Sequence, residues 1–121
     1  MYTTARDWAR FGLLFAQDGV WNGERILPEG WVDYSRTPTP SSLGEYGGMW
    51  WLNASDAGKP ETKEWPDMPD DIFYADGHDG QSVVIFPSQN IIIVRLSVSR
   101  DGAWDMAEFL ADIMAAVEEI K

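Results

Sequence analysis

The chain has 121 residues, the usual length of one domain, and 45% of them are apolar, which fits a globular rather than a disordered protein. Twenty acidic residues against nine basic ones give a net charge of −11, which repels phosphate backbones and excludes nucleic acid as an expected partner. Cysteine is absent, which excludes disulfides, and no apolar run reaches the ~18 residues of a membrane span. We therefore expect residues 1–121 to form a single domain.

The N-terminal segment predicts a helix. Thr4 followed by Asp7 matches an N-terminal capping pattern. Apolar residues then recur at helical spacing, and Gly19 stands where a glycine commonly ends a helix. The expected helix covers residues 5–18.

Turn signals dominate the next segment. Asn22-Gly23 stands between two short extended arms, which is a strong signal for a two-residue hairpin. Pro28 suits the first turn of a short helix, which we expect to end near Arg36. Residues 37–45 form a loop by composition.

The middle of the chain combines a glycine-containing strand with a polar loop. Residues 46–53, "YGGMWWLN", predict a strand in which the glycines mark a bulge or a close backbone approach. Residues 54–70 form a long polar insertion with three prolines, and a loop of this length is usually functional. Trp50 and Trp51 must point to opposite faces of a strand. Trp65 is therefore the better candidate for an exposed platform that binds a sugar face.

Three further strands are expected at 72–77, 81–86 and 91–99. Asp79-Gly80 joins the first two tightly, and residues 87–90 join the second to the third. Short strands joined by tight turns form an antiparallel meander.

From Ala103 the apolar period becomes helical. The apolar residues fall on one stripe and the acidic residues lie off it, which predicts a helix that packs one face on the sheet. The expected fold class is α+β, an antiparallel meander sheet packed by this C-terminal helix and by the N-terminal helices.

His78 is the only histidine in the chain, and it can exchange a proton near neutral pH. Gly77 and Gly80 beside it would let a substrate approach the backbone. An ordinary hairpin turn that contains a histidine explains the same residues. Asp76 and Asp79 are close in sequence, but this set lacks the ligand number and geometry of a metal site. We expect neither a metal nor a cofactor.

A serine nucleophile needs a base within hydrogen-bond reach. No serine in the chain is followed three positions later by lysine, and the G-x-S-x-G pattern is absent. The sequence "SQN" at 88–90 follows a strand and lies in a turn, so we regard its match to S-x-N as accidental.

Several segments in order resemble a known family. Residues 3–32 ("TTARDWARFGLLFAQDGVWNGERILPEGWV"), 46–53 and 77–97 ("GHDGQSVVIFPSQNIIIVRLS") resemble the serine β-lactamase and penicillin-binding protein superfamily. The closest resemblance is to class C β-lactamase-like serine hydrolases, which include 6-aminohexanoate-dimer hydrolases. The resemblance leaves out the loop 54–70 and implies a partial β-lactamase/transpeptidase-like fold.

The resemblance assigns roles to residues of the turn. The family's third motif, K-T-G or H-x-G, falls on His78-Asp79-Gly80, and the backbone N–H of Gln81 would supply half of an oxyanion hole. Asp79 and Gly77 would line the substrate, a small molecule with an amide, ester or β-lactam bond. The resemblance also implies a bacterial protein of the periplasm or the cytoplasm.

The family's nucleophile motif S-x-x-K and its second motif Y-x-N are both absent. We therefore expect a C-terminal fragment that is inactive alone and that self-associates through an exposed sheet edge. Two alternatives stay open: a non-catalytic module that binds a glycan or a protein through Trp65 and residues 54–70, and a vestigial structural domain.

Overall fold

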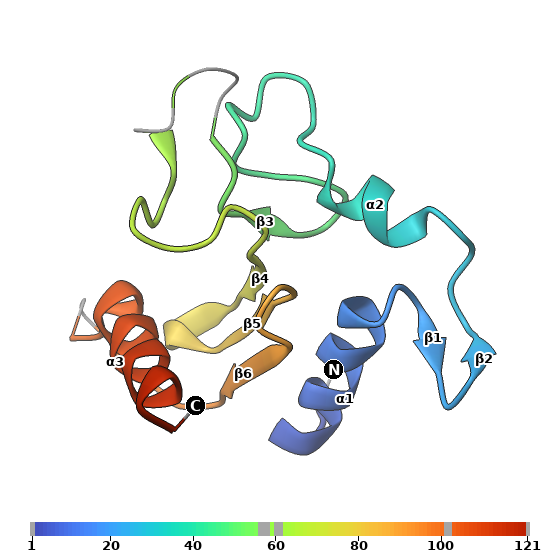
Figure 1. Ribbon diagram of the computed structural model, residues 1–121. Coiled ribbons are helices and arrows are strands. Elements are labelled where there is room, and N and C mark those ends of the chain that lie inside the picture. Colours follow the sequence, from blue (N-terminus) through green and yellow to red (C-terminus); the bar gives the residue numbers. More distant parts are fainter. Residues whose placement is uncertain (1, 56–58, 60–61, 101–102, 121) are drawn as a thin grey trace.

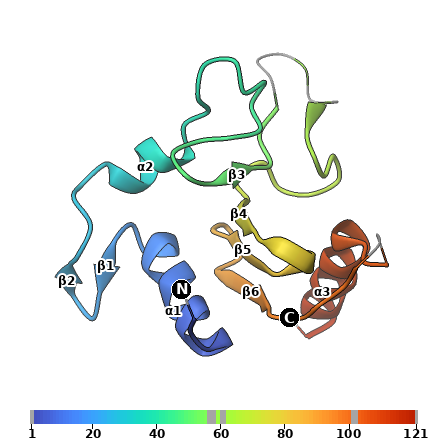
Figure 2. The same cartoon turned by 180° about the vertical axis from the view of Figure 1, so that it is seen from behind.

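The computed structural model describes residues 2–55, 59, 62–100 and 103–120. Its elements are, in chain order, α1 (Ala5–Ala16), β1 (Val20–Trp21), β2 (Glu24–Arg25), α2 (Trp31–Arg36), β3 (Trp51–Leu52), β4 (Phe73–Asp76), β5 (Ser82–Phe86), β6 (Ile91–Arg95) and α3 (Met106–Ile120). Strands β3 to β6 form an antiparallel sheet, and α1 and α3 lie on opposite sides of it (Figure 1). Figure 2 shows the same arrangement from behind. The predicted α+β class is confirmed.

Helix α1 forms where the capping pattern predicts it. The Thr4 hydroxyl accepts a hydrogen bond from the Asp7 backbone N–H at 3.2 Å and donates to the Asp7 carboxylate at 2.7 Å. The helix ends at Ala16, before the predicted end at residue 18. The helix ends there because the Gly19 N–H donates a hydrogen bond to the Leu14 carbonyl at 2.8 Å, which closes the last turn.

The predicted hairpin is confirmed. Strand β1 pairs with β2 in antiparallel register, and Asn22 and Gly23 form the turn with φ angles of 49° and 82°. Helix α2 begins at Trp31 and not at the predicted Pro28. Pro28 lies in the preceding turn, where its carbonyl accepts a hydrogen bond from the Trp31 N–H at 3.1 Å.

The predicted strand 46–53 is wrong over most of its length. Only Trp51–Leu52 belongs to the sheet, and Tyr46 forms a single bridge with Trp51. The chain between them turns toward α2, where the Gly48 N–H donates to the Ser35 carbonyl oxygen at 2.9 Å. A Cβ on Gly47 would lie 2.2 Å from that oxygen, so this glycine marks the close backbone approach that its position predicts.

The antiparallel meander is confirmed. The strand order is β3-β4-β5-β6, with Asp76 opposite Ser82 and Phe86 opposite Ile91. Strand β6 ends at Arg95 and not at the predicted residue 99. Beyond this point the chain bonds to the turn between β4 and β5, because the Arg95 side chain donates to the Gly80 carbonyl and the Ser99 N–H donates to the Asp79 carbonyl.

The sheet separates two hydrophobic clusters, because successive residues of a strand point to opposite faces. The face toward α1 buries Phe15, Val32, Trp50, Leu52, Phe73, Val83 and Ile85. The face toward α3 buries Trp65, Ile72, Tyr74, Val84, Phe86, Ile93 and Leu110. Every residue of β5 is buried, as expected for the strand between both helices.

Helix α1 lies directly on the sheet because Gly12 has no side chain. A Cβ on Gly12 would lie 2.9 Å from Cγ2 of Ile92 in β6, which is closer than real Cβ contacts. The N-terminal helix is therefore packed against the last strand of the sheet.

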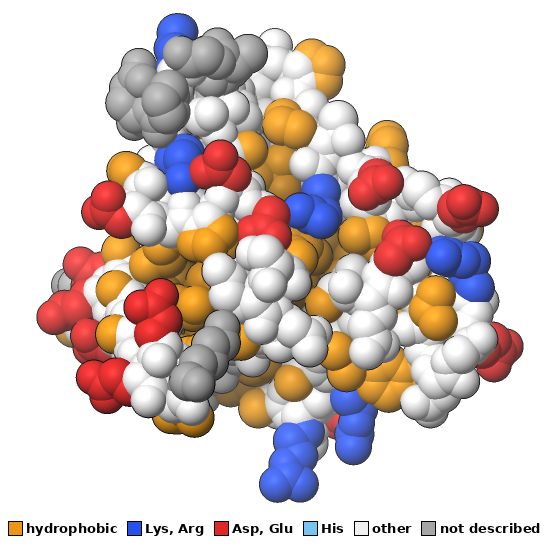
Figure 3. All heavy atoms as spheres, viewed as in Figure 1, with side chains coloured by type: hydrophobic (Ala, Val, Ile, Leu, Met, Phe, Trp, Pro, Cys, Tyr) orange, Lys and Arg blue, Asp and Glu red, His pale blue; other side chains and the backbone are white. Residues whose placement is uncertain are grey.

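Helix α3 buries Leu110 completely and keeps its acidic residues at the surface. Figure 3 shows acidic side chains over α3 at the left of the molecule. Within the described ranges, no helix has the length and apolar character needed to cross a membrane.

The loop after β3 is fixed to the sheet by Asn53, whose side chain is fully buried. Its Nδ2 donates to the carbonyls of Trp65 and Pro69 at 3.1 and 3.0 Å, and its Oδ1 accepts from the Trp65 N–H at 2.8 Å. Trp65 is only 6% exposed and packs on Tyr74 with ring centroids 4.6 Å apart. The predicted exposed platform at Trp65 is therefore wrong, because a buried indole cannot offer its face to a sugar.

We predict that Asn53→Ala lowers the free energy of unfolding by about 2–4 kcal/mol, because it leaves one N–H and two carbonyls buried without partners. Urea unfolding followed by tryptophan fluorescence measures this loss. Ser55→Ala is the matched control, since Ser55 starts the same loop and its change should stay within about 0.5 kcal/mol. A loss below about 1 kcal/mol for Asn53→Ala would contradict the anchoring role.

Candidate functional site

The predicted site residues lie on the turn between β4 and β5. The Gly77 N–H donates to the Gln81 carbonyl at 2.7 Å, which extends the strand pairing by one step beyond Asp76 and Ser82. His78–Gly80 then form a single 3-10 turn between the two strands. The tight connection that Asp79-Gly80 predicts is therefore present, and it carries all five candidate residues.

Two successive residues of this turn have left-handed backbone, with φ of 59° at Asp79 and 78° at Gly80. Aspartate and glycine are among the residues that adopt this conformation most readily. A Cβ on Gly80 would also lie 2.8 Å from Nη1 of Arg95 and 3.2 Å from Cδ1 of Trp104. Both the backbone angle and the crowding therefore require glycine at position 80.

Arg95 braces the turn from the end of β6. Its Nη1 donates to the Gly80 carbonyl at 2.7 Å, and its Nη2 donates to the Ser99 hydroxyl at 2.6 Å. The guanidinium lies over the Trp104 ring, 3.7 Å from the centroid, and the Ser99 N–H donates to the Asp79 carbonyl at 2.9 Å. Sequence reasoning missed this role, although a lone arginine at the end of the apolar run "IIIV" was a visible signal.

His78 projects from the turn with a side chain that is 92% exposed. Its Nε2 lies 3.4 Å from Oδ1 of Asp79, whose side chain is 20% exposed. The imidazole is therefore free to contact a molecule that reaches the turn, and Asp79 is its one close charged neighbour within the described part of the chain.

The Gln81 backbone N–H makes only a long hydrogen bond of 3.4 Å, to the His78 carbonyl. The same carbonyl accepts from the Gln81 side chain at 3.2 Å. Because N–H to oxygen distances are usually 2.7–3.2 Å, the backbone N–H is weakly engaged and can be redirected to a better acceptor.

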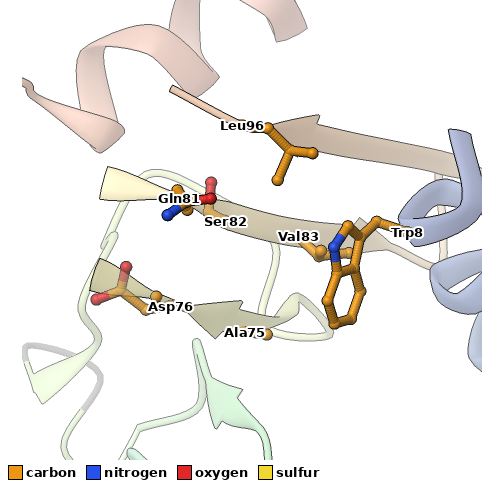
Figure 4. A pocket seen from close by; sticks show the side chains of 8 residues that line it. Trp8, Ala75, Asp76, Gln81, Ser82, Val83 and Leu96 are labelled. Atoms are coloured by element: carbon orange, nitrogen blue, oxygen red, sulfur yellow. The ribbon is translucent and has the colours of Figure 1, made fainter. Parts of the chain in front are cut away.

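A cavity of about 220 Å³ lies beside the turn on the α1 face of the sheet. Trp8, Val83 and Leu96 form its apolar part, and Asp76 and Gln81 lie at the end away from Trp8 (Figure 4). This cavity could receive an apolar group next to the turn.

A second cavity of about 300 Å³ lies on the α3 face. Its lining includes Gly77 and Gly80 of the turn, together with Tyr74, Trp104 and Glu64. The turn therefore borders one cavity on each face of the sheet. In the described residues, no group of three or more histidine and carboxylate side chains is placed to hold a metal ion.

Tyr74 is 8% exposed, and its ring packs on that of Trp65. Burial raises the pKa of Tyr74 to about 12, and the carboxylates of Glu64, Asp76 and Glu45 add to the increase. These three carboxylates therefore lie near the Tyr74 phenol, next to the candidate site.

Comparison with known proteins identifies the fold. No protein-family model matches the sequence. An uncharacterized protein of Alkalihalophilus pseudofirmus is 25% identical over 118 residues, which span 93% of this chain and 34% of that protein. A solved structure described as a putative 6-aminohexanoate-dimer hydrolase from Bacillus anthracis matches with a TM-score of 0.68.

The structural match covers 95% of this chain and 28% of the Bacillus anthracis chain, with 24% sequence identity. The chain thus spans 34% of the length of the first protein and 28% of the second. At this identity the match shows a shared fold, and the predicted partial β-lactamase-like fold is confirmed.

We predict that Tyr74 causes a loss of stability in strong alkali. Below pH 10 the phenol is neutral in both the folded and the unfolded chain. Between pH 10 and about 12 the unfolded phenol ionises while the buried one stays protonated, so the free energy of unfolding falls as pH rises. Tyr74→Phe should remove part of this fall, as measured by urea unfolding at pH 9 and pH 11.

Tyr34→Phe is the matched control, because it removes a phenol that is 65% exposed. If both variants lose stability between these two pH values as steeply as the unmodified chain, the buried phenol is not the cause.

Proposed function

We propose that this chain is the C-terminal part of a β-lactamase-like serine hydrolase that cleaves amide, ester or β-lactam bonds. The observation that carries the proposal is the shared fold with a putative 6-aminohexanoate-dimer hydrolase over nearly the whole chain. In this proposal the turn 77–81 forms one wall of an acyl-transfer site.

The Gln81 N–H is proposed to donate to the oxyanion that develops on the substrate. A fixed N–H at this position contributes about 3 kcal/mol to transition-state stabilisation. One observation supports the assignment: the existing hydrogen bond of this N–H is long, at 3.4 Å. His78 would contact polar groups of the substrate, and Gly77 and Asp79 would line it.

The nucleophile and its base are proposed to come from a part of a longer protein that is not in this sequence. No serine here has lysine three positions later, so residues 1–121 cannot begin an acyl-enzyme reaction by that route. The glycan-binding alternative has lost its main support, because Trp65 is buried.

The role of Gln81 can be tested in a chimera. The matching segment of the Bacillus anthracis protein is replaced by residues 1–121, and turnover of a p-nitrophenyl ester is measured. Gln81→Pro deletes the N–H, while its φ of −75° already suits proline. We expect kcat to fall by about 10²–10³-fold.

Gln81→Ala is the matched control, because it keeps the N–H and should retain most of the activity. The isolated chain should show no turnover of nitrocefin or of the ester. Equal activity of the proline and alanine variants would reject the oxyanion role, and a folded chimera without turnover would reject the hydrolase proposal.

We also propose that the chain self-associates through the outer edge of β6, which pairs only with β5 within the described residues. Leu96 and Val98 directly follow this edge and are 42% and 64% exposed. Unpaired strand edges with neighbouring apolar side chains are templates for pairing with another chain.

Sedimentation velocity at rising concentration should show oligomers, and Leu96→Lys with Val98→Lys should shift them toward monomer. Ile120→Lys adds the same kind of charge at an exposed apolar residue of a different element, the end of α3, and should have little effect. A monomer at all concentrations would count against this interface.

A further inference from the structure

The peptide group that joins Gly80 to Gln81 is held at its carbonyl end. Nη1 of Arg95 donates to the Gly80 carbonyl oxygen at 2.7 Å. The N–H at the other end of the same peptide, that of Gln81, makes only the 3.4 Å hydrogen bond to the His78 carbonyl. Because a peptide group is planar and trans, its C=O and N–H point in opposite directions. The hydrogen bond from Arg95 therefore sets the direction of the Gln81 N–H.

The turn itself does little to fix this peptide. Rotation about ψ of Gly80 and φ of Gln81 is enough to flip it, and glycine restricts its own backbone less than any other residue. The long hydrogen bond of the Gln81 N–H adds little resistance to such a flip. The orientation is therefore selected from outside the turn, by Arg95 at the end of β6.

Gly80 allows the guanidinium to lie directly against the backbone. A Cβ at this position would be 2.8 Å from Nη1 of Arg95 and 3.2 Å from Cδ1 of Trp104. The space that a side chain would occupy is thus filled by these two residues. The close approach that glycine permits here is the approach of an arginine to the carbonyl of the same residue.

The guanidinium is itself fixed by its neighbours. Its Nη2 donates to the Ser99 hydroxyl at 2.6 Å, and it lies 3.7 Å from the centroid of the Trp104 ring. That ring packs on Phe109 of α3 with centroids 4.7 Å apart. Nε1 of Trp104 is buried without a hydrogen-bond partner in the described part of the chain. The indole is therefore placed by its packing between Arg95 and Phe109 and not by a hydrogen bond of its own.

The positive charge of Arg95 is directed at the peptide. Among the residues that the structure describes, Arg95 forms no ion pair with a carboxylate. A hydrogen bond from a charged donor is roughly twice as strong as a neutral one, and it polarises the group that accepts it. Electron density drawn toward the Gly80 oxygen makes the N–H of the same peptide a stronger donor. Arg95 therefore both orients the Gln81 N–H and strengthens it.

We propose that Arg95 is a positioning residue of the candidate acyl-transfer site and acts on the reaction through the Gly80–Gln81 peptide. This inference rests on the proposed function, because the Gln81 N–H is the proposed donor to the oxyanion. Donors that are oriented before the reaction stabilise a transition state most, since they need no reorganisation when charge develops. Helix α3 then contributes to the site through Phe109 and Trp104, in addition to covering the sheet.

The kinetic test uses the chimera with the Bacillus anthracis protein and a p-nitrophenyl ester. Arg95→Ala should lower kcat by about 10–100-fold and leave KM nearly unchanged, because the interaction that it supports is made in the transition state. Arg95→Lys keeps the charge and the aliphatic stem, but it cannot donate in a planar fork to both Gly80 and Ser99. Its kcat should therefore be intermediate, and it serves as the test variant if Arg95→Ala does not fold.

Arg36→Ala is the matched control. Arg36 also donates to a backbone carbonyl, that of Asp71 at 3.1 Å, and also lies over an aromatic ring, that of Phe73 at 5.1 Å. These contacts are at the start of β4, at the opposite end of the strand from the turn. Arg36→Ala should lower the free energy of unfolding about as much as Arg95→Ala does, but it should leave kcat unchanged.

Two further measurements separate positioning from stability. In a chimera that already carries Gln81→Pro, Arg95→Ala should cause little additional loss of kcat, because the N–H through which Arg95 acts is gone. Methylguanidinium, at concentrations well below those that unfold the protein, should restore part of the kcat of Arg95→Ala. Methylammonium at the same concentration and ionic strength should not, because it lacks the planar fork.

The orientation of the peptide can be measured in residues 1–121 alone, without turnover. The backbone ¹⁵N resonance of Gln81 responds to the hydrogen bond that the Gly80 carbonyl accepts. It should shift in Arg95→Ala, return toward its original position with methylguanidinium, and stay in place in Arg36→Ala.

Unchanged kcat in Arg95→Ala, a full additional loss in the Gln81→Pro background, or an unmoved Gln81 resonance overturns the inference. If the unmodified chimera shows no turnover, the hydrolase proposal fails instead, and the Gln81 resonance still decides whether Arg95 orients the peptide. The two proposals therefore fail in distinguishable ways.

Discussion

The buried amide of Asn53 fixes the residues that follow β3 to the sheet, beside the candidate site. Its hydrogen bonds to Trp65 and Pro69 bring a long polar loop onto the α3 face of the sheet. The ring of Trp65 then packs on Tyr74, and Glu64 next to it enters the lining of the cavity on that face. The Asn53 side chain thus supplies the hydrogen bonds that the backbone of Trp65 and Pro69 would otherwise make to water, and it places Glu64 beside the candidate site.

The alternation of β4 gives this region its chemical character. Ala75 points to the α1 face and Tyr74 to the α3 face, while Asp76, at the end of the strand, lines cavities on both faces. The turn 77–81 lies at the end of this strand and borders a cavity on each face.

Local signals predicted local structure well. The Thr4 cap, the Asn22-Gly23 turn and the apolar runs of the meander all led to the observed elements, because each depends on residues that are neighbours in the chain. Prediction failed where distant residues decide. Trp65 looked exposed because its loop is polar, yet Asn53 draws it inside, and the brace from Arg95 to Gly80 depends on a fold that no local pattern encodes.

The packing of α1 on the last strand has a consequence for biosynthesis. Helix α1 is synthesised before the strands of the sheet, so Gly12 meets its neighbour Ile92 only after almost the whole sheet has been made. Because synthesis adds about 5–20 residues per second, the apolar face of the helix stays without its partner strands for several seconds. Because transiently exposed apolar surface is prone to aggregation, the close approach that stabilises the finished sheet also exposes the nascent chain to that risk.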